Sequence, residues 1–423
     1  MDMTEAARAE SPSVREAIPQ AESSIRARSE DRDEPSWLVE FRLASLEALR
    51  GRWNRPWSLL SGSIDLDRFF EYRRPEPRVS PGSEAPYGPI RDELGRQGVL
   101  LMGLDRAVHK VPGMVREVLG SAVSSEDGPS AAFNGATWSG GSFLYVPRGV
   151  HVRMPLQPEF REDFHRTEPI ERTLIVVDEA ASVDFIDGCA APMFAPSGLH
   201  ASVAEIVVRK GGHIGYVTLQ NWSKDVHSLV TKRARIHEGA SMEWLEANLG
   251  SRKTVKAPSV QLAGSGARAE IRNLVLAGPG QHQAIGAEAD HLAPDTSSRL
   301  EARVLLRGNG RVTYEPRVLV TKEARGARSV SEWTALALDE GTHWEATPSL
   351  VVEQREAWAS QSGSMERFAE DIAIDSSPGR RSAREAVRRK ARTLFEPFLR
   401  RIPEEYAVEV ERLVGLELDG AVG

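Results

Sequence analysis

Cys189 is the only cysteine of the chain, so it carries the only thiol that could do sulfur chemistry. A thiolate is the nucleophile in persulfide and disulfide exchange, and it needs access and a favourable electrostatic setting. A lone cysteine is also a common small core residue, so this second interpretation stays open. The single thiol excludes an internal disulfide and any multi-cysteine zinc or iron–sulfur site that this chain would build alone.

The residues around this thiol form short apolar runs that must position it. Runs such as Val203–Val208 and Leu229–Ile236 are rich in β-branched residues and bounded by glycine, which predicts strands. Turn signals recur at Gly211, Gly239 and Gly266, roughly 27 to 28 residues apart. Regular turns between short strands favour a stacked β-solenoid, with an ordinary β-sandwich as the alternative.

Composition shifts divide the chain into four segments. We predict a disordered tail at 1–34, a helical domain at 35–130, a β core at 131–360 and a helical region at 361–423. The tail is charged and poor in large apolar side chains, so it cannot offset its ordering entropy by burial. Strands are expected to fade after Asp339. Four residues share one face of a predicted helix near the start: Leu38, Phe41, Leu46 and Leu49.

Charge and hydropathy exclude several functions. The formal net charge is −7, which gives no electrostatic support for nucleic-acid binding. No apolar run approaches the roughly 18 residues of a membrane span, and the start of the chain has no hydrophobic signal core. Acidic residues in the tail argue against a transit peptide. A basic run near 380–392 is interpreted as a solvated helix face. We therefore expect a cytoplasmic protein.

Long co-linear stretches of this sequence are similar to one known family. They include TWSGGSFLYVPRGVHVRMPLQPEFR (137–161), ERTLIVVDEAASVDFIDGCAAP (171–192), LQNWSKDVHSLVTKRA (219–234) and GASMEWLEANLGSRKT (239–254). The similarity continues through LAGPGQHQAIGAEADHLAPDTSS (276–298) and the tail 395–423. On these motifs the chain resembles the SufB/SufD family of SUF iron–sulfur cluster assembly, and SufB more closely.

The resemblance implies a mainly β fold, a right-handed parallel β-helix with helical regions at both ends. It also implies three kinds of partner: a SufC-like ABC-type ATPase, a SufD-like or SufB-like homologue, and a cysteine desulfurase with its sulfur carrier. This chain has no G-x-x-x-x-G-K-[ST] loop, so we expect a scaffold subunit that hydrolyses no ATP itself. The alternative is a divergent paralogue that carries persulfide sulfur in another biosynthetic pathway.

The resemblance places Cys189 on the family's G-C-x-A-P cysteine and makes it the expected persulfide acceptor. The family's cluster cysteine, in E-C-D-x-L, is replaced by Trp333, which cannot ligate a metal. Glu332 remains. An ungapped alignment puts Gln361–Ser364 on the family's H-E-A-T segment, whereas a gapped alignment retains Glu345. We expect no cofactor on the isolated chain and a transient iron–sulfur cluster only in a complex, with Glu332 and Glu345 as residual ligand candidates.

The resemblance assigns the C-terminal helices to ATPase docking. Five apolar residues are the predicted anchors: Phe395, Tyr406, Val410, Leu413 and Val414. The alternative is that this stripe packs on the chain's own solenoid.

Other polar residues near the motifs receive structural interpretations. Glu243 and Glu246 have opposite strand parity, which predicts a strand end or a bulge. Four histidines are interpreted as structural or solvent-facing: His200, His227, His282 and His291.

Overall fold

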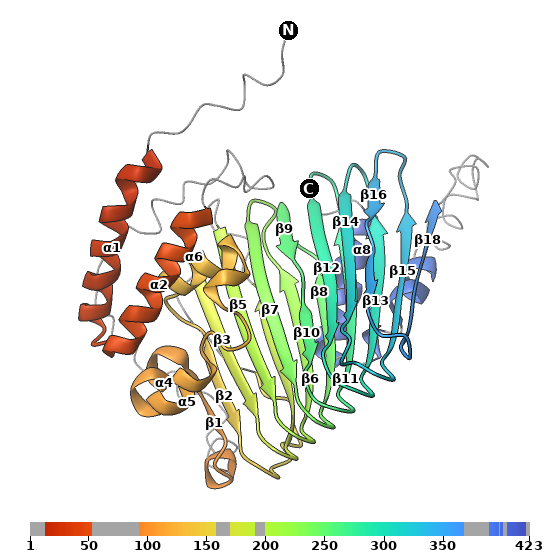
Figure 1. The fold of residues 1–423 in the computed structure, drawn as a ribbon. Helices are drawn as coiled ribbons and strands as arrows, with labels where there is room; N and C mark the ends of the chain where they lie inside the picture. Colours follow the sequence, from red (N-terminus) through yellow and green to blue (C-terminus); the bar gives the residue numbers. More distant parts are fainter. Residues whose placement is uncertain are drawn as a thin grey trace, which may run out of the picture.

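Two parallel β-sheets, wound from one continuous chain, make up most of the molecule (Figure 1). The computed structural model describes residues 13–52, 93–157, 170–190, 199–367, 389–396, 398–400 and 404–419. Within those ranges, the side chains of 13–20, 51–52, 189–190, 405–406, 409, 413 and 416–419 lie outside the description. No helix in the described part of the chain is long and apolar enough to cross a bilayer.

The chain alternates between the two sheets. The first sheet has the order β1-β2-β3-β5-β7-β10-β12-β14-β16, with β9 and β17 in the same layer, and the second has the order β18-β15-β13-β11-β8-β6-β4. The strands of the first sheet are β1 (Leu100–Gly103), β2 (Ser142–Val146), β3 (Ile170–Val177), β5 (Leu199–Val208), β7 (His227–Ile236), β9 (Lys253–Lys256), β10 (Ser259–Leu262), β12 (His282–His291), β14 (Arg311–Val320), β16 (His343–Ala346) and β17 (Ser349–Val352). Those of the second are β4 (Ser182–Ala190), β6 (His213–Asn221), β8 (Ser241–Asn248), β11 (Arg268–Ala277), β13 (Ser297–Leu306), β15 (Arg328–Ala337) and β18 (Trp358–Arg367).

Strand pairing confirms the solenoid and excludes the sandwich. Every described strand pair except β1 with β2 is parallel, and each strand pairs with the strand one coil away. His200 and Ser228, for example, are partners in register. Gly211 and Gly239 turn the chain at positive φ, and the Gly211 N–H donates to the carbonyl of Glu238 in the next coil. The repeating turn glycines therefore report the coil period of a parallel β-helix.

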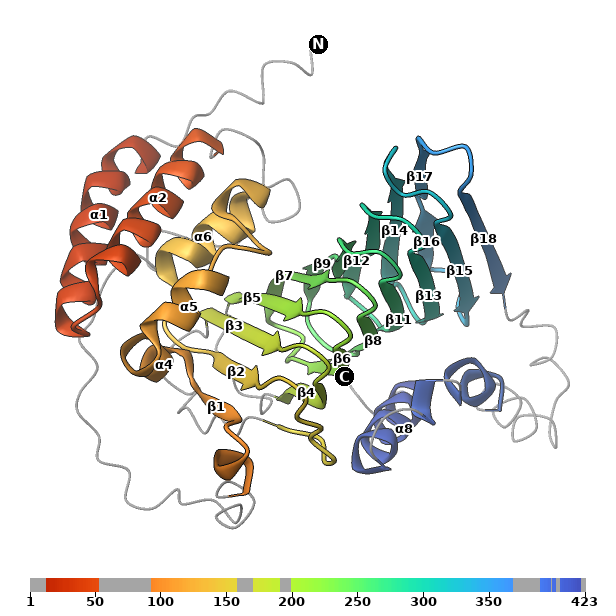
Figure 2. The same cartoon turned by 60° about the horizontal axis from the view of Figure 1, so that its bottom comes forward.

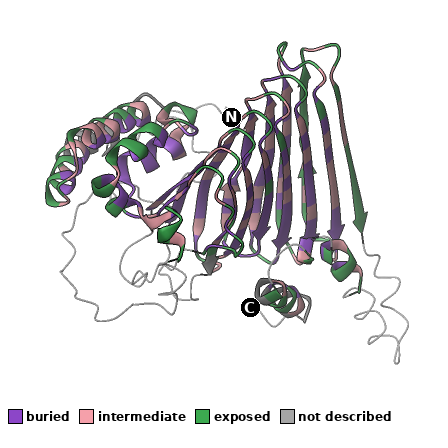
Figure 3. Cartoon of the chain, turned by 90° about the horizontal axis from the view of Figure 1, so that it is seen from below, coloured by how far each residue is buried: buried purple, intermediate pink, exposed green. Residues whose placement is uncertain are grey.

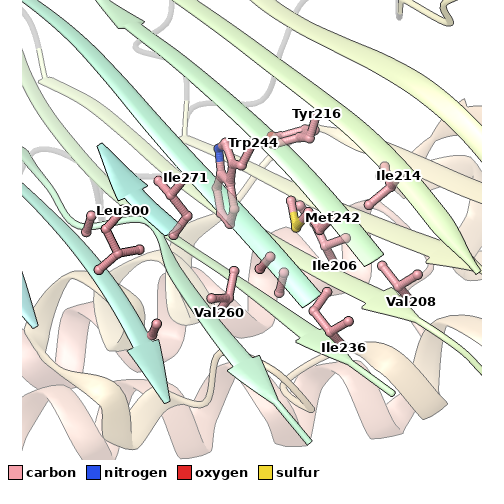
Figure 4. Packing of buried hydrophobic residues seen from close by; sticks show 14 of the residues in the cluster. Ile206, Val208, Ile214, Tyr216, Ile236, Met242, Trp244, Val260, Ile271 and Leu300 are labelled. Carbon is pink, nitrogen blue, oxygen red and sulfur yellow. The ribbon is translucent and has the colours of Figure 1, made fainter. Parts of the chain in front are cut away.

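The interior of the β-helix is a continuous apolar column over much of its length. It contains Ile206, Ile236 and Val260 from the first sheet and Met242 and Ile271 from the second, all essentially inaccessible to solvent (Figure 4). Alternation along each strand places every second side chain inside, as pleated strands require. This column fixes the register from which the interior polar residues project.

Helices cover the outer face of the first sheet near its N-terminal end (Figure 1). They are α1 (Ser13–Asp31), α2 (Ser36–Arg52), α4 (Leu104–Lys110), α5 (Pro112–Val118) and α6 (Pro129–Thr137), with the 3₁₀ turn η2 (Ser125–Asp127). The predicted face of α2 is confirmed, because Leu38, Leu46 and Leu49 are buried. The helical layer extends to Thr137, beyond the predicted boundary at 130.

A buried ion pair ties this layer to the β-helix. Arg172 of β3 donates to Glu205 of β5 at 2.7 Å, and both side chains are inaccessible to solvent. Glu205 also accepts from the N–H groups of Ala122 and Val123, in the segment between α5 and α6. The carboxylate thus satisfies several buried donors at once, which a fully buried charge requires.

The prediction of a disordered tail at 1–34 is wrong from Ser13 onward, where α1 begins. Ala21 and Ile25 of α1 are buried, and Arg28 donates to the carbonyl of Thr137 at 2.9 Å. The compositional argument failed because α1 packs through a few residues, which include Ala21, Ile25 and the buried Arg28, and not through a long apolar stripe. Residues 1–12 lie outside the described residues.

The C-terminal region returns to cover the outer face of the second sheet (Figure 2). Phe395 and Phe398, together with Val410 of α8 (Glu404–Asp419), pack on Leu245 and Leu274. Strands do not fade after Asp339, because β16, β17 and β18 follow it and β18 ends only at Arg367. Figure 3 shows that the last strand, β18, is mostly exposed to solvent, whereas the strands that the C-terminal region covers are mostly buried.

Candidate functional site

A row of polar residues interrupts the apolar interior of the β-helix. Asp187 of β4, Thr218 of β6 and Glu246 of β8 are partners in register, one coil apart. The same ladder continues through Asn273, Ala302 and Trp333 to Gly363. One line of inward positions thus runs from Asp187 to Trp333 and changes from polar to apolar along its length.

Lys232 reaches this row from the first sheet. Its Nζ lies 2.8 Å from Oδ2 of Asp187 and 3.1 Å from the hydroxyl of Tyr216, which itself donates to Asp187 at 2.6 Å. Burial alone would raise the pKa of Asp187, but the Lys232 ammonium and these two hydrogen bonds lower it below its usual value. Asp187 is therefore a carboxylate held ionised two residues before Cys189.

A second buried pair lies one coil further along. Lys256 of β9 contacts Glu246, and Trp244 donates its Nε1–H to Glu246 Oε1 at 2.8 Å. Burial lowers the pKa of Lys256, and the Glu246 carboxylate partly restores it. The predicted strand end or bulge near Glu243 and Glu246 is wrong, because β8 is regular through both. Glu243 is exposed while Glu246 is buried, so alternation alone separates them.

Cys189 lies beside this row in the backbone. It is the eighth residue of β4 and the register partner of Gln220 in β6. Gln220 is buried and donates to Ser251 Oγ at 3.3 Å and to Thr254 Oγ1 at 3.4 Å. Nearby, Asn248 Nδ2 and Gln283 Oε1 are buried with no hydrogen-bond partner in the described part of the chain. Buried polar atoms of this kind normally bind water or a small polar ligand.

Aromatic side chains close the other end of the row. Tyr314 stacks on Trp344 at 6.3 Å between ring centroids and lies 5.9 Å from the ring of Trp333. A methyl group at Gly363 would lie 1.8 Å from Trp333 Nε1, so the indole occupies the space that glycine leaves. Trp333, where the resemblance predicts a cluster cysteine, thus places an aromatic ring on the ladder that begins at Asp187.

The structure does not bring the two residual ligand candidates together. Glu332 lies on the outside of the second sheet, where it accepts from Arg299 at 2.7 Å. Glu345 lies on the outside of the first sheet, 3.9 Å from His343. Two carboxylates on opposite outer faces cannot bind one ion. Among the described residues, no group of three or more histidine, cysteine, aspartate or glutamate side chains is arranged to hold a metal.

The segment Gln361–Ser364 belongs to β18 and pairs in register with Ser331–Thr334. The HWEAT segment instead begins with β16 on the other sheet. Gln361–Ser364, which the ungapped alignment places on the H-E-A-T segment, therefore lie on the strand next to Trp333.

The chain is similar in sequence to known proteins of one family. The family model described as SUF system FeS cluster assembly, SufBD core domain, matches residues 161–372. The iron–sulfur cluster assembly protein SufB of Bacillus subtilis is 34% identical over 425 residues, covering 93% of this chain and 91% of that protein. The chain belongs to the SufB/SufD family. SufBD family proteins of Staphylococcus epidermidis and Staphylococcus haemolyticus are each 33% identical, over 93% and 95% of this chain and 92% and 94% of theirs.

Within this SufB/SufD-family chain, the described C-terminal anchors face inward. Phe395, Val410 and Val414 are at most 7% exposed and pack against the second sheet. The side chains of Tyr406 and Leu413 lie outside the described residues. The burial favours the alternative interpretation of the stripe as part of the chain's own core. A partner that docks on α8 would meet its opposite face, where Val408 is 59% exposed.

Two of the histidines confirm their structural interpretation. His200 is buried and hydrogen-bonded to Ser228 Oγ at 3.0 Å, and His291 is buried between Thr296 and Ser298. The interior residues that sequence reasoning missed are Lys232, Glu246 and Lys256. For Lys232 and Glu246 the signal was strand parity, since each alternates in step with interior apolar residues of its own strand. The short strand β9 has no interior apolar residue that could give this signal for Lys256.

Proposed function

We propose that this chain is a scaffold subunit of an iron–sulfur cluster assembly complex that works with a SufC-type ATPase and receives sulfur as persulfide. Family membership supports the general role. One observation supports the sulfur role: the backbone of Cys189 is in register with that of the buried Gln220, two residues after Asp187 at the start of the polar row. The charges of the row are paired, Lys232 with Asp187 and Lys256 with Glu246, but Asn248 Nδ2 and Gln283 Oε1 stay buried without a partner in the described part of the chain. Unsatisfied polar atoms beside buried ion pairs favour chemistry or a polar ligand there over packing alone.

In the proposed step, the thiolate of Cys189 attacks the outer sulfur of a persulfide on a donor protein. The donor's S–S bond breaks, its thiolate leaves, and a new S–S bond forms on Cys189, so no net oxidation or reduction occurs. Asp187 lies two residues before Cys189 on β4 and forms an ion pair with Lys232 of β7. We infer that the Lys232 ammonium favours the anionic persulfide that results.

Intact-mass spectrometry after incubation with a cysteine desulfurase, its sulfur carrier and cysteine tests this role. We expect adducts of one or more sulfur atoms on the native chain and none on Cys189→Ser. Cys189 that reacts with a thiol reagent only after unfolding would identify a buried core residue and refute the proposal. Lys232→Met should slow sulfur uptake, whereas Lys210→Met, on the exposed Glu238 ion pair, serves as the matched control.

We also propose that the isolated chain assembles no cluster, because the ladder carries Trp333 rather than a thiolate where the resemblance predicts the cluster cysteine. Anaerobic reconstitution with iron and sulfide, followed by visible absorption and iron quantitation, tests this. A stoichiometric cluster that survives desalting on the chain alone would contradict it. A cluster that forms only with a homologous partner agrees with the scaffold role.

The end of the β-helix supports pairing with a second copy or a homologue. The strand β17 pairs only with β14, and β18 only with β15, so each has an unpaired edge in the described structure. Leu350, Val351 and Val352 of β17 are 41 to 46% exposed, and Trp358 of β18 is 56% exposed. Apolar strands with free edges are typical of an interface rather than a solvated surface.

The second candidate function is that of a persulfide carrier for another pathway, working in the same cytoplasmic compartment. The replacement of the family cysteine by Trp333 favours it, because the chain keeps the acceptor and lacks the cluster ligand. Transfer of labelled sulfur from Cys189 to a small-molecule acceptor, with no cluster formed alongside an intact SufB, would favour the carrier over the scaffold.

A further inference from the structure

A row of basic residues crosses the outer face of the first sheet. His227, Lys253, His282, Arg311 and His343 are the first residues of five adjacent strands. They are partners in register from each strand to the next. With neighbouring strands about 4.8 Å apart, the row spans about 19 Å. We call these five residues the basic row.

Elsewhere on the two sheets, several outward arginines are matched by carboxylates. Arg317 of β14 contacts Glu288 at 2.7 Å and Asp290 at 3.0 Å in the next strand. Arg303 of β13 likewise contacts Glu301 at 2.6 Å. These pairs neutralise the charge of the surface one strand at a time.

The basic row is different. In the described part of the chain, neither Lys253 nor Arg311 has a hydrogen bond or ion pair with a carboxylate. The outward positions two residues further along are Leu229, Val255, Ala284, Thr313 and Glu345, so the only carboxylate among them is at the last strand. The row therefore carries two positive charges without a carboxylate partner, on Lys253 and Arg311, one on each side of His282.

Neighbouring positive charges also lower the pKa values of two histidines in the row. Burial lowers the pKa of His282, and Lys253, Arg311 and His343 lower it further. Burial, Arg252 and Lys253 act in the same direction on His227. A bound anion would relieve this repulsion, because an opposite charge within a few ångströms favours the protonated forms.

We propose that the basic row docks the acidic face of a helix from a partner protein. The spacing selects a helix over an extended peptide. One helical turn advances about 5.4 Å, which is close to the spacing of about 4.8 Å between strands. Carboxylates placed once per turn therefore stay within about 3 Å of the successive residues of the basic row over its whole length. Same-face residues of an extended strand are about 6.7 Å apart and drift by about 8 Å over the same distance.

In the described part of the chain, the row is open to solvent at one end. Arg311 and His343 are exposed, while His227, Lys253 and His282 are half-buried. The helical layer covers β5 and β7 near the His227 end, where Leu229 is buried against it. A docked helix would therefore run from the edge of that layer toward β16.

Fluorescence anisotropy with a labelled synthetic peptide tests the proposal on the full chain. The probe is an 18-residue helical peptide with one glutamate per turn, and its comparison peptide has the same composition with glutamates at alternate positions. We expect the striped peptide to bind more tightly, and its affinity to fall as salt rises from 50 to 200 mM.

Charge reversal locates the binding. Lys253→Glu with Arg311→Glu should lower the affinity by about tenfold, since each reversed charge at the rim contributes about 0.7 kcal/mol. The matched control is Arg268→Glu with Arg328→Glu, which makes the same charge change at exposed first residues of β11 and β15 on the opposite sheet. That control should retain affinity within about twofold.

Three results would overturn the proposal. Equal losses in the two double variants would show a general charge effect. Equal binding of both peptides would remove the role of the helical stripe. Binding of tripolyphosphate at the row, without binding of the striped peptide, would assign the row to a small polyanion instead of a protein.

Discussion

Glu246 and Lys256 form an ion pair inside the β-helix, where the side chain of Glu246 is 0% and that of Lys256 is 1% exposed. They come from different sheets, β8 and β9, so the pair links the two walls of the solenoid. Trp244 gives the carboxylate a second donor. Removing one partner of such a pair leaves an uncompensated buried charge, whereas removing both leaves mainly a packing change.

Lys256→Met should therefore lower the free energy of unfolding by about 3 to 5 kcal/mol. Glu246→Gln combined with Lys256→Met should recover most of that loss. Urea denaturation monitored by tryptophan fluorescence measures both variants. If the double variant is as unstable as the single one, the pair is not the source of the loss.

His291 predicts a pH dependence of stability. Burial lowers its pKa to about 4, and the neutral ring bridges Thr296 and Ser298. Between pH 6.5 and about 4, His291 is protonated in the unfolded state but neutral in the folded state. The free energy of unfolding therefore falls as the pH drops through this range. The loss amounts to about 3 kcal/mol. His291→Gln should flatten the curve of unfolding free energy against pH, and parallel curves for the two proteins would contradict the assignment.

Substitutions at two valines of α8 can distinguish a residue of the chain's own core from a residue of a docking surface. Val410→Asp puts a carboxylate in the cluster on the second sheet and should lower the melting temperature strongly, because Val410 is 0% exposed. Val408→Asp lies on the 59% exposed side and should leave the melting temperature unchanged while weakening co-purification with an ABC-type ATPase. An unchanged melting temperature for Val410→Asp would return that residue to the candidate anchors.

The exposed end of the β-helix predicts self-association or pairing with a homologue. Val351→Glu with Trp358→Glu should convert the associated form to monomer in sedimentation velocity, alone or mixed with the homologue. Met114→Glu changes an equally apolar residue, 36% exposed on α5, and should have no effect. Dissociation by both variants would point to a general loss of folding rather than to this edge.

The sequence was sufficient for the solenoid, because turn glycines and short apolar runs repeat with the coil. It was also sufficient for the face of α2, where Leu38 and Leu46 are spaced for a helix. It could not place Glu246, since a charged residue in a strand normally faces water and only the partner Lys256, on the other sheet, makes its burial tolerable. Cys189 and Trp333 were found as separate motifs, whereas the ladder from Asp187 to Trp333 depends on a register summed over five coils.

The covering of the second sheet by α8 has a consequence for synthesis of the protein. Leucines of that face, including Leu219, Leu245 and Leu274, are made well before the helix that covers them. As the coils stack one by one behind the ribosome, this apolar strip stays open until Val410 and Val414 emerge. Chains that stop before Glu404 should therefore fold their coils yet aggregate through the strip, which makes the last helix a checkpoint on completion of translation.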